Sequence, residues 1–204
     1  MLTVEWLRER FRTGPAPAPV RELPFRSTEP VAAAVLVPIV ARPGGLTVLF
    51  TQRTAHLRDH AGQISFPGGR SEPEDVSPQA TALRESREEV GLRSEQVEIV
   101  GTLPEYATST GYRVTPVVGI VTPPLNLALD DFEVAEAFET PLAFFLDAAN
   151  YRRESRDYAG SRRSYWAVPW QGYFIWGATA GMLVSLREQL VGGDLPRASV
   201  LSSP

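Results

Sequence analysis

The chain contains 204 residues, and its 43% hydrophobic content is enough to bury a core, which excludes a protein disordered throughout. Its 20 basic and 24 acidic side chains give a net charge of -4, which excludes the global positive field that attracts nucleic acid. The absence of cysteine excludes disulfides, thiolate metal ligands and thiol catalysis.

The amino-terminal region combines a short helix with a proline-rich arm. Residues 2–12 place apolar side chains among charges at the spacing of an amphipathic helix, and residues 13–24 end it with repeated prolines. The longest apolar run, residues 31–41, is too short to span a bilayer, and no signal-type apolar stretch precedes it. We expect a soluble, cytoplasmic protein with no membrane or nucleic-acid partner, whose residues 1–30 lead into the main domain.

The core begins with two apolar segments, residues 31–41 and 45–53, which we expect to form a hairpin around the turn at Arg42 to Gly45. Strands and helices then alternate without a strict repeat, so we expect an α/β (α+β) fold in which helices flank a mixed sheet. This main domain covers residues 31–195, and residues 196–204 form a flexible tail. Further strands are expected within residues 96–106, 112–122, 134–142, 150–160 and 161–170, and further helices within 141–147 and 173–191.

A well-delimited helix of about 13 residues is expected after Ser77. Ser77 suits the N-cap, Pro78 the first helical position and Gly91 a left-handed C-cap. On this helix Glu85, Glu88 and Glu89 share an arc of about 100°. We expect all three carboxylates to face outward while the opposite side of the helix packs on the sheet.

Two interpretations of this acidic face are open. The first is a solvated helix with weak local ion pairs to neighbouring arginines. The second is a metal site, because three clustered carboxylates repel one another unless a cation such as Mg²⁺ or Mn²⁺ binds between them. The preceding glycines, Gly68 and Gly69, would let the backbone approach a ligand closely.

The segment from Gly69 to Leu92 resembles the signature box of the Nudix hydrolases, which cleave a nucleoside diphosphate linked to another group with Mg²⁺ or Mn²⁺. Asp75 stands where the family has glutamate, one residue farther from Arg84 than usual, and Ser86 replaces an aliphatic residue. We therefore give Asp75 no catalytic role. The matching positions are Gly69, Arg84, Glu85, Glu88, Glu89, Gly91 and Leu92.

The segment before the box, residues 49–69, is similar to the corresponding segment of the coenzyme A diphosphatases, a Nudix subfamily that also tolerates the aspartate and the longer spacing. The matches are Arg53, Thr54, Leu57, Arg58, His60, Gly62, Gln63, Phe66, Pro67, Gly68 and Gly69.

The resemblance implies a Nudix α/β/α sandwich and hydrolysis of coenzyme A or acyl-CoA to adenosine 3',5'-bisphosphate and 4'-phosphopantetheine or its acyl form. It implies metal binding by Glu85, Glu88 and Glu89, which are also the catalytic residues together with Arg84. Substrate binding is assigned to Arg53, Arg58, His60, Gly68 and Gly69. Two alternatives stay open: a Nudix hydrolase of another nucleoside diphosphate derivative, such as ADP-ribose or a dinucleotide, and a non-catalytic Nudix-fold binding module.

Three further expectations concern residues around the box. Arg84 is expected to orient a box carboxylate through a bidentate ion pair. The general base is left open among Glu88, Glu89 and three acids outside the box, Glu133, Glu136 and Glu139. The carboxy-terminal aromatic residues suit a core or a homodimer interface better than adenine stacking; these are Trp166, Trp170, Tyr173, Phe174 and Trp176.

Overall fold

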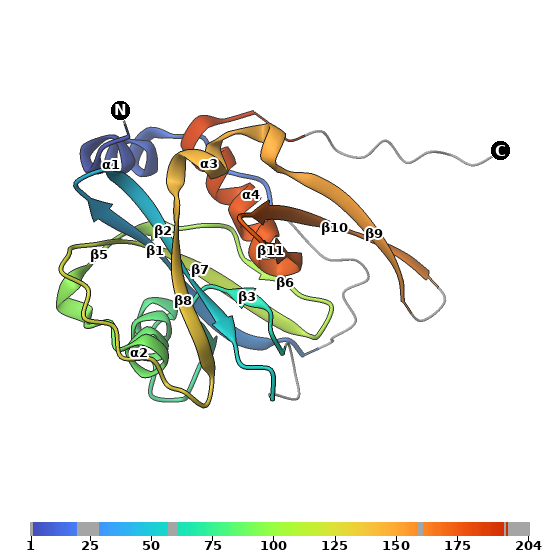
Figure 1. Cartoon of the computed structure of the whole chain (residues 1–204), viewed down its shortest axis with the longest axis horizontal. Helices are drawn as coiled ribbons and strands as arrows, with labels where there is room; N and C mark the ends of the chain where they lie inside the picture. Colours follow the sequence, from blue (N-terminus) through green and yellow to red (C-terminus); the bar gives the residue numbers. More distant parts are fainter. Residues whose placement is uncertain (1, 20–28, 57–60, 159–160, 194, 196–204) are drawn as a thin grey trace.

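A computed structural model describes residues 2–19, 29–56, 61–158, 161–193 and 195, and for residues 158 and 161–163 only the backbone (Figure 1). Among these residues no helix is long and apolar enough to cross a membrane. The helices are α1 (Val4–Thr13), α2 (Pro78–Val90), η1 (Ser94–Gln96), α3 (Leu142–Leu146), η2 (Ala148–Asn150) and α4 (Gly177–Val191). The strands are β1 (Val31–Arg42), β2 (Gly45–Arg53), β3 (Ile64–Ser65), β4 (Gly68–Arg70), β5 (Val97–Thr102), β6 (Tyr106–Ala107), β7 (Tyr112–Val121), β8 (Val134–Pro141), β9 (Arg152–Tyr158), β10 (Ser161–Trp170) and β11 (Tyr173–Trp176).

The main sheet is mixed and is built around β1. Its central order is β3-β2-β1-β7-β5, with β4 paired to β1, β6 to β7 and β8 to β2. Strands β1 and β7 run parallel, from the pair Val31 and Tyr112 to the pair Val40 and Val121. The other described ladders of this sheet are antiparallel. A three-stranded sheet, ordered β11-β10-β9, lies beside it.

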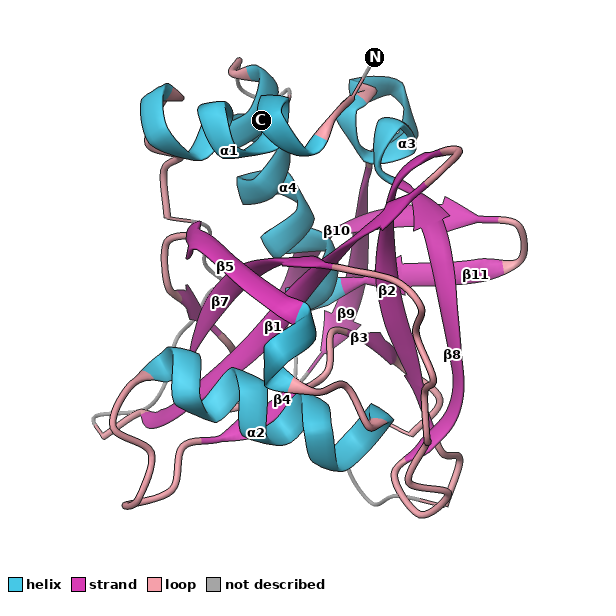
Figure 2. Cartoon of the chain, turned by 90° about the vertical axis from the view of Figure 1, so that its left-hand side faces the viewer, coloured by secondary structure: helices cyan, strands magenta, loops and turns pink. Residues whose placement is uncertain are grey.

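Helices cover both faces of the main sheet (Figure 2). On one face Ala82 and Val90 of α2 join a buried cluster that includes Leu36 of β1. On the other face Leu183 of α4 belongs to a larger cluster that includes Ile39 of β1. Successive side chains of a strand point to opposite faces, so β1 supplies apolar groups to both clusters. The predicted mixed sheet flanked by helices is confirmed.

Helix α1 packs against the main domain. The hydroxyl of Thr3 caps it by accepting a hydrogen bond from the Trp6 N–H at 3.1 Å. Leu7 is fully buried in the larger cluster. The side-chain amide of Gln189, on α4, donates to the Arg10 carbonyl at 2.9 Å. Helices α1 and α4, the first and last of the described residues, are therefore in direct contact.

The predicted helix over residues 173–191 is wrong at its start. Residues Tyr173–Trp176 form strand β11, which pairs with β10, and the helix begins only at Gly177. The turn between these strands places Gln171 and Gly172 at φ values of 41° and 90°. The side chains of Tyr173 and Phe138 then stack with ring centroids 3.7 Å apart. Aromatic residues suit strands and buried helices alike, so the apolar pattern did not separate the two elements.

Candidate functional site

Helix α2 forms as the sequence predicts. It covers Pro78–Val90, and the Ser77 hydroxyl accepts a hydrogen bond from the Ala80 N–H at 3.1 Å. Gly91 ends the helix in the left-handed region, with φ 70°. These local caps fix the position of the three glutamates along the helix axis.

The three glutamates of α2 differ sharply in exposure. The side chain of Glu88 is 55% exposed and that of Glu85 17%. The side chain of Glu89 is only 6% exposed, and its Oε2 accepts a hydrogen bond from the Gly68 N–H at 3.2 Å. The prediction that all three carboxylates face outward is therefore wrong for Glu89, because β4 passes beside this turn of the helix.

Burial makes ionisation of two of these acids unfavourable. Burial raises the pKa of Glu89 to about 8, although the Gly68 N–H and Arg53 oppose the rise. Burial also raises the pKa of Glu85, against the opposing effect of Arg84. The charge of Glu133, which precedes β8, adds to the rise at both carboxyl groups. The site thus brings together more negative charge than its arginines compensate.

Arg84 is the centre of the ion-pair network beside α2. Its Nε and Nη2 contact Oδ1 and Oδ2 of Asp75 at 3.2 and 3.0 Å. Its Nη1 lies 2.9 Å from Glu85 Oε1 and 3.0 Å from Glu88 Oε2, and Nη2 also donates to the Arg70 carbonyl. The expected bidentate pair with a box carboxylate therefore forms with Asp75, the early acid of the box, while Glu85 and Glu88 share Nη1.

The two glycines before the box allow close packing within the protein. A Cβ on Gly68 would overlap the Ala34 carbonyl oxygen, and its φ of 155° also disfavours a side chain. A Cβ on Gly69 would lie 2.6 Å from the carboxylate of Glu85. These contacts bring β4 close to β1 and α2, whereas contact of the glycines with substrate stays a prediction.

Arg53, like Gly68 and Gly69, is a predicted substrate-binding residue that the structure brings to the acidic site. Its Nη1 lies 3.7 Å from Glu89 Oε1 and its Nη2 lies 3.6 Å from Glu133 Oε2. Arg58 and His60 lie outside the described residues.

The three acids proposed as bases outside the box occupy different environments. Glu133 is paired with Arg53 and acts electrostatically on Glu85 and Glu89. Glu136 accepts a hydrogen bond from the Tyr173 hydroxyl at 2.6 Å, and Glu139 pairs with Arg42. Glu133 is therefore the acid of these three that belongs to the site.

The negative charge of the three box glutamates, Glu85, Glu88 and Glu89, suits a divalent cation. Within the described ranges, no three His, Cys, Asp or Glu side chains converge in the arrangement of a metal site. The box carboxylates are instead turned toward Arg84 and Arg53. Carboxylate oxygens are nevertheless the ligands that Mg²⁺ and Mn²⁺ prefer, and a cation would favour the ionised forms that burial, with a smaller contribution from neighbouring acids, disfavours at Glu85 and Glu89.

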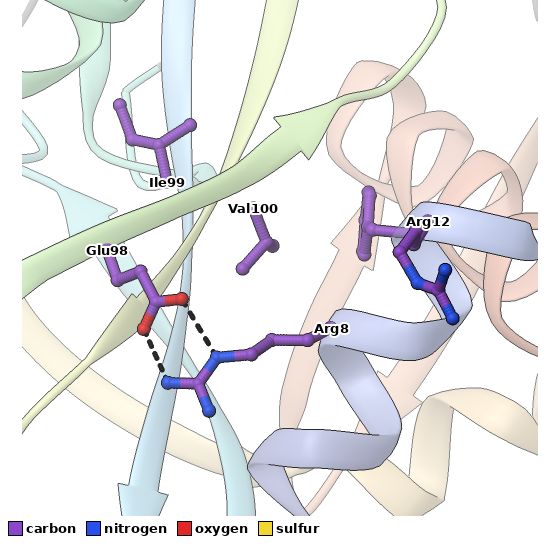
Figure 3. Close-up of a pocket in the computed structure, with 6 residues that line it drawn as sticks. Arg8, Arg12, Glu98, Ile99 and Val100 are labelled. Atoms are coloured by element: carbon purple, nitrogen blue, oxygen red, sulfur yellow. Dashed lines mark hydrogen bonds and ion pairs between the residues drawn. The ribbon is translucent and has the colours of Figure 1, made fainter.

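A hollow of about 330 Å³ lies apart from this acidic cluster, between α1 and β5 (Figure 3). Arg8 and Arg12 line it, with Phe11 and Val100 contributing apolar surface. Arg8 forms a bidentate pair with Glu98, and Arg12 pairs with Glu9. Both cations are therefore already paired, and the hollow shares no lining residue with the Glu85, Glu89 and Arg84 cluster.

Comparison with known proteins identifies the family. Residues 30–155 match the sequence profile of the NUDIX domain. The chain belongs to the Nudix family. A Citrobacter koseri protein named uncharacterized Nudix hydrolase NudL is 45% identical over 160 residues, which cover 78% of this chain and 82% of that protein. The protein of the same name from Escherichia coli K12 is 46% identical over 159 residues, with the same coverage.

Solved structures add little to this assignment. The Ap4A hydrolase of C. elegans is 23% identical, covers 54% of this chain and 80% of its own, and superposes with a TM-score of 0.45. This similarity is too distant to indicate a substrate. The family itself makes this chain a Nudix hydrolase, acting on the phosphoanhydride bond of a nucleoside diphosphate derivative.

The Asp75–Arg84 pair predicts a specific pH dependence of stability. Arg84 holds the pKa of Asp75 well below its usual value, so the pair stabilises the folded state above the unfolded pKa of about 4. That contribution is lost as the pH falls through the lower folded pKa. Asp75→Asn is expected to lower the free energy of unfolding at pH 7, and the deficit is expected to shrink below about pH 4.

Denaturant unfolding of the wild type and Asp75→Asn across this pH range would measure the effect. Asp131→Asn is the control, because Asp131 is exposed on the loop before β8. A deficit of constant size at every pH would show that the ion pair is not its source.

Proposed function

We propose that this Nudix hydrolase cleaves the diphosphate bond of coenzyme A and its acyl derivatives. The products are adenosine 3',5'-bisphosphate and 4'-phosphopantetheine or its acyl form. The main support is that the segment resembling coenzyme A diphosphatases, residues 49–69, contacts the box helix directly. Arg53 Nη1 lies 3.7 Å from Glu89, and the Gly68 N–H donates to the same carboxylate.

The negative charge of coenzyme A agrees with the basic side chains of residues 49–69. Coenzyme A carries a 3'-phosphate in addition to its diphosphate, so a site that binds it needs more positive charge than one for a simple diphosphate. Arg53 supplies a guanidinium at the acidic cluster. We propose Arg58 and His60 as further phosphate-binding groups, on the resemblance of their segment alone.

We propose Mg²⁺ or Mn²⁺ as the cofactor, held by Glu85, Glu88 and Glu89. When bound, the ion neutralises phosphate charge and lowers the pKa of water. Arg84 keeps Glu85 and Glu88 oriented through Nη1 while Asp75 fixes the other side of its guanidinium. Gly68 orients Glu89 through its N–H.

We propose Glu133 as the proton acceptor for the attacking water. Its side chain is 41% exposed, so water can reach it, and its charge acts on both Glu85 and Glu89. Arg53 lies between Glu133 and Glu89, with distances of 3.6 and 3.7 Å to the two carboxylates. Glu136 and Glu139 are engaged elsewhere.

Two other functions compete with this proposal. A different nucleoside diphosphate derivative, such as ADP-ribose or a dinucleotide, would need the same carboxylates but no group for a 3'-phosphate. A non-catalytic binding module is disfavoured, because Glu85, Glu88 and Glu89 are all present beside Arg84. Cytoplasmic location and a homodimer stay predictions, which cell fractionation and sedimentation would test.

Replacing Glu89 by Gln is expected to abolish hydrolysis while the protein stays folded. The substitution removes a metal-ligating charge, whereas a neutral amide suits a buried position. Turnover of coenzyme A, acyl-CoA, ADP-ribose and a diadenosine polyphosphate would be measured with Mg²⁺ and with Mn²⁺. Thermal unfolding would monitor the fold.

The matched control is Glu95→Gln, an exposed glutamate in η1. Unchanged activity in Glu89→Gln would refute the metal assignment. Turnover of ADP-ribose without release of adenosine 3',5'-bisphosphate from coenzyme A would refute the proposed substrate and leave the family activity in place.

Replacing Glu133 by Gln is expected to lower kcat by roughly 10² to 10⁴, the usual range for loss of a general base. Glu136→Gln is the control, since its carboxylate accepts a hydrogen bond from Tyr173. Single-turnover rates would separate the chemical step from product release. Equal rates in the two variants would exclude Glu133 as the base.

A further inference from the structure

Phe132 is a large apolar side chain that lies at the protein surface. It is 65% exposed, on the turn that precedes β8. A single exposed ring is ordinary on a protein surface, so exposure alone does not indicate binding. Phe132 is distinguished instead by the residues around it.

The backbone around Phe132 is held firmly in place. The Thr54 hydroxyl donates to the Phe132 carbonyl at 2.7 Å, and the Thr54 N–H donates to the Glu133 carbonyl at 3.0 Å. The Phe132 N–H in turn donates to Asp130 Oδ1 at 2.9 Å. Thr54 is itself buried. The exposed ring thus projects from an ordered turn, which lowers the entropic cost of binding against it.

A second ring lies against Phe132. The imidazole of His56 is exposed, and its centroid lies 5.0 Å from that of Phe132 at an angle of 57°. The two rings come from segments that leave the same end of the β2–β8 pair, where Arg53 is in register with Val134 (Figure 1). Together Phe132 and His56 form an aromatic pair at the surface.

Residues close to Phe132 and His56 in the sequence belong to the acidic site. Phe132 is followed by Glu133, and Arg53, one residue before Thr54, contacts both Glu133 and Glu89. Consecutive Cα atoms are about 3.8 Å apart, so the Phe132 backbone lies within one residue of the site. Phe132 is thus one residue along the chain from Glu133, and His56 is three residues from Arg53, so both rings come from segments that also supply side chains to the site.

We propose that Phe132, supported by His56, binds the planar base of the nucleoside diphosphate substrate by stacking. Asp130 and Asp131 lie on this turn and disfavour an anionic group beside the rings, whereas a neutral planar base is compatible with them. Every nucleobase presents a π-face to an aromatic side chain. The inference deepens the proposed function, because it rests on the diphosphate binding at the acidic site.

The test uses Phe132→Ala and Phe132→Trp in the full chain. For whichever nucleoside diphosphate derivative the wild type hydrolyses fastest, Phe132→Ala is expected to raise KM roughly tenfold or more, with kcat nearly unchanged. Phe132→Trp is expected to restore KM, since tryptophan also stacks. A fall in kcat at unchanged KM would overturn the inference.

Binding of AMP and ribose 5-phosphate, measured by calorimetry, isolates the base. Phe132→Ala is expected to weaken AMP binding roughly tenfold, the order of one lost base–aromatic stack, and to leave ribose 5-phosphate binding unchanged. Equal weakening of both ligands would assign the ring to the sugar phosphate and overturn the proposal. This comparison needs no turnover, so it tests base stacking even if coenzyme A proves not to be the substrate.

The matched control is Phe174→Ala, which removes the exposed phenylalanine of β11, 42% exposed. It is expected to leave both KM and AMP affinity unchanged. If Phe174→Ala weakens AMP binding while Phe132→Ala does not, the base binds at the carboxy-terminal hairpin and the inference is wrong.

Discussion

The burial of Glu89 between α2 and β4 is the constraint on which the site depends. Ionising a carboxyl group in this position costs free energy, because burial removes its hydration, and the pKa of Glu89 rises to about 8. The Gly68 N–H and Arg53 offset part of that cost. Glu133 and Glu85 add negative charge nearby and raise this pKa further, so the ionised form of Glu89 needs more positive charge than Arg53 supplies.

The two arginines of the site, Arg84 and Arg53, have different roles. Arg84 is fixed by Asp75 on one side and by Glu85 and Glu88 on the other, so it shapes the acidic helix. Arg53 is held more loosely, at 3.6 to 3.7 Å from its two carboxylates. Among the described residues Arg53 thus has longer ion-pair contacts than Arg84, so turning its guanidinium toward a phosphate breaks fewer short hydrogen bonds.

Local signals in the sequence predicted α2 well, because Ser77, Pro78 and Gly91 act through their immediate neighbours. The outward orientation of Glu89 was predicted wrongly, since its burial depends on β4, a strand about 20 residues away that helical periodicity does not include. A bidentate pair of Arg84 with a box carboxylate was expected, but helical periodicity does not identify Asp75 as the partner, because Asp75 reaches Arg84 from the loop before the helix. Strand β11 was missed because its aromatic residues fit either element.

The contact between α1 and α4 joins parts of the chain that are synthesised far apart in time. Gln189 and Arg10 are separated by 179 positions, yet one hydrogen bond connects them. Leu7 packs in the same cluster as Leu183 and Leu186, so it has no complete burial site until the last helix has left the ribosome. Helix α1 is therefore synthesised well before α4, the helix that completes its packing, and until then the apolar face that carries Leu7 lacks this partner.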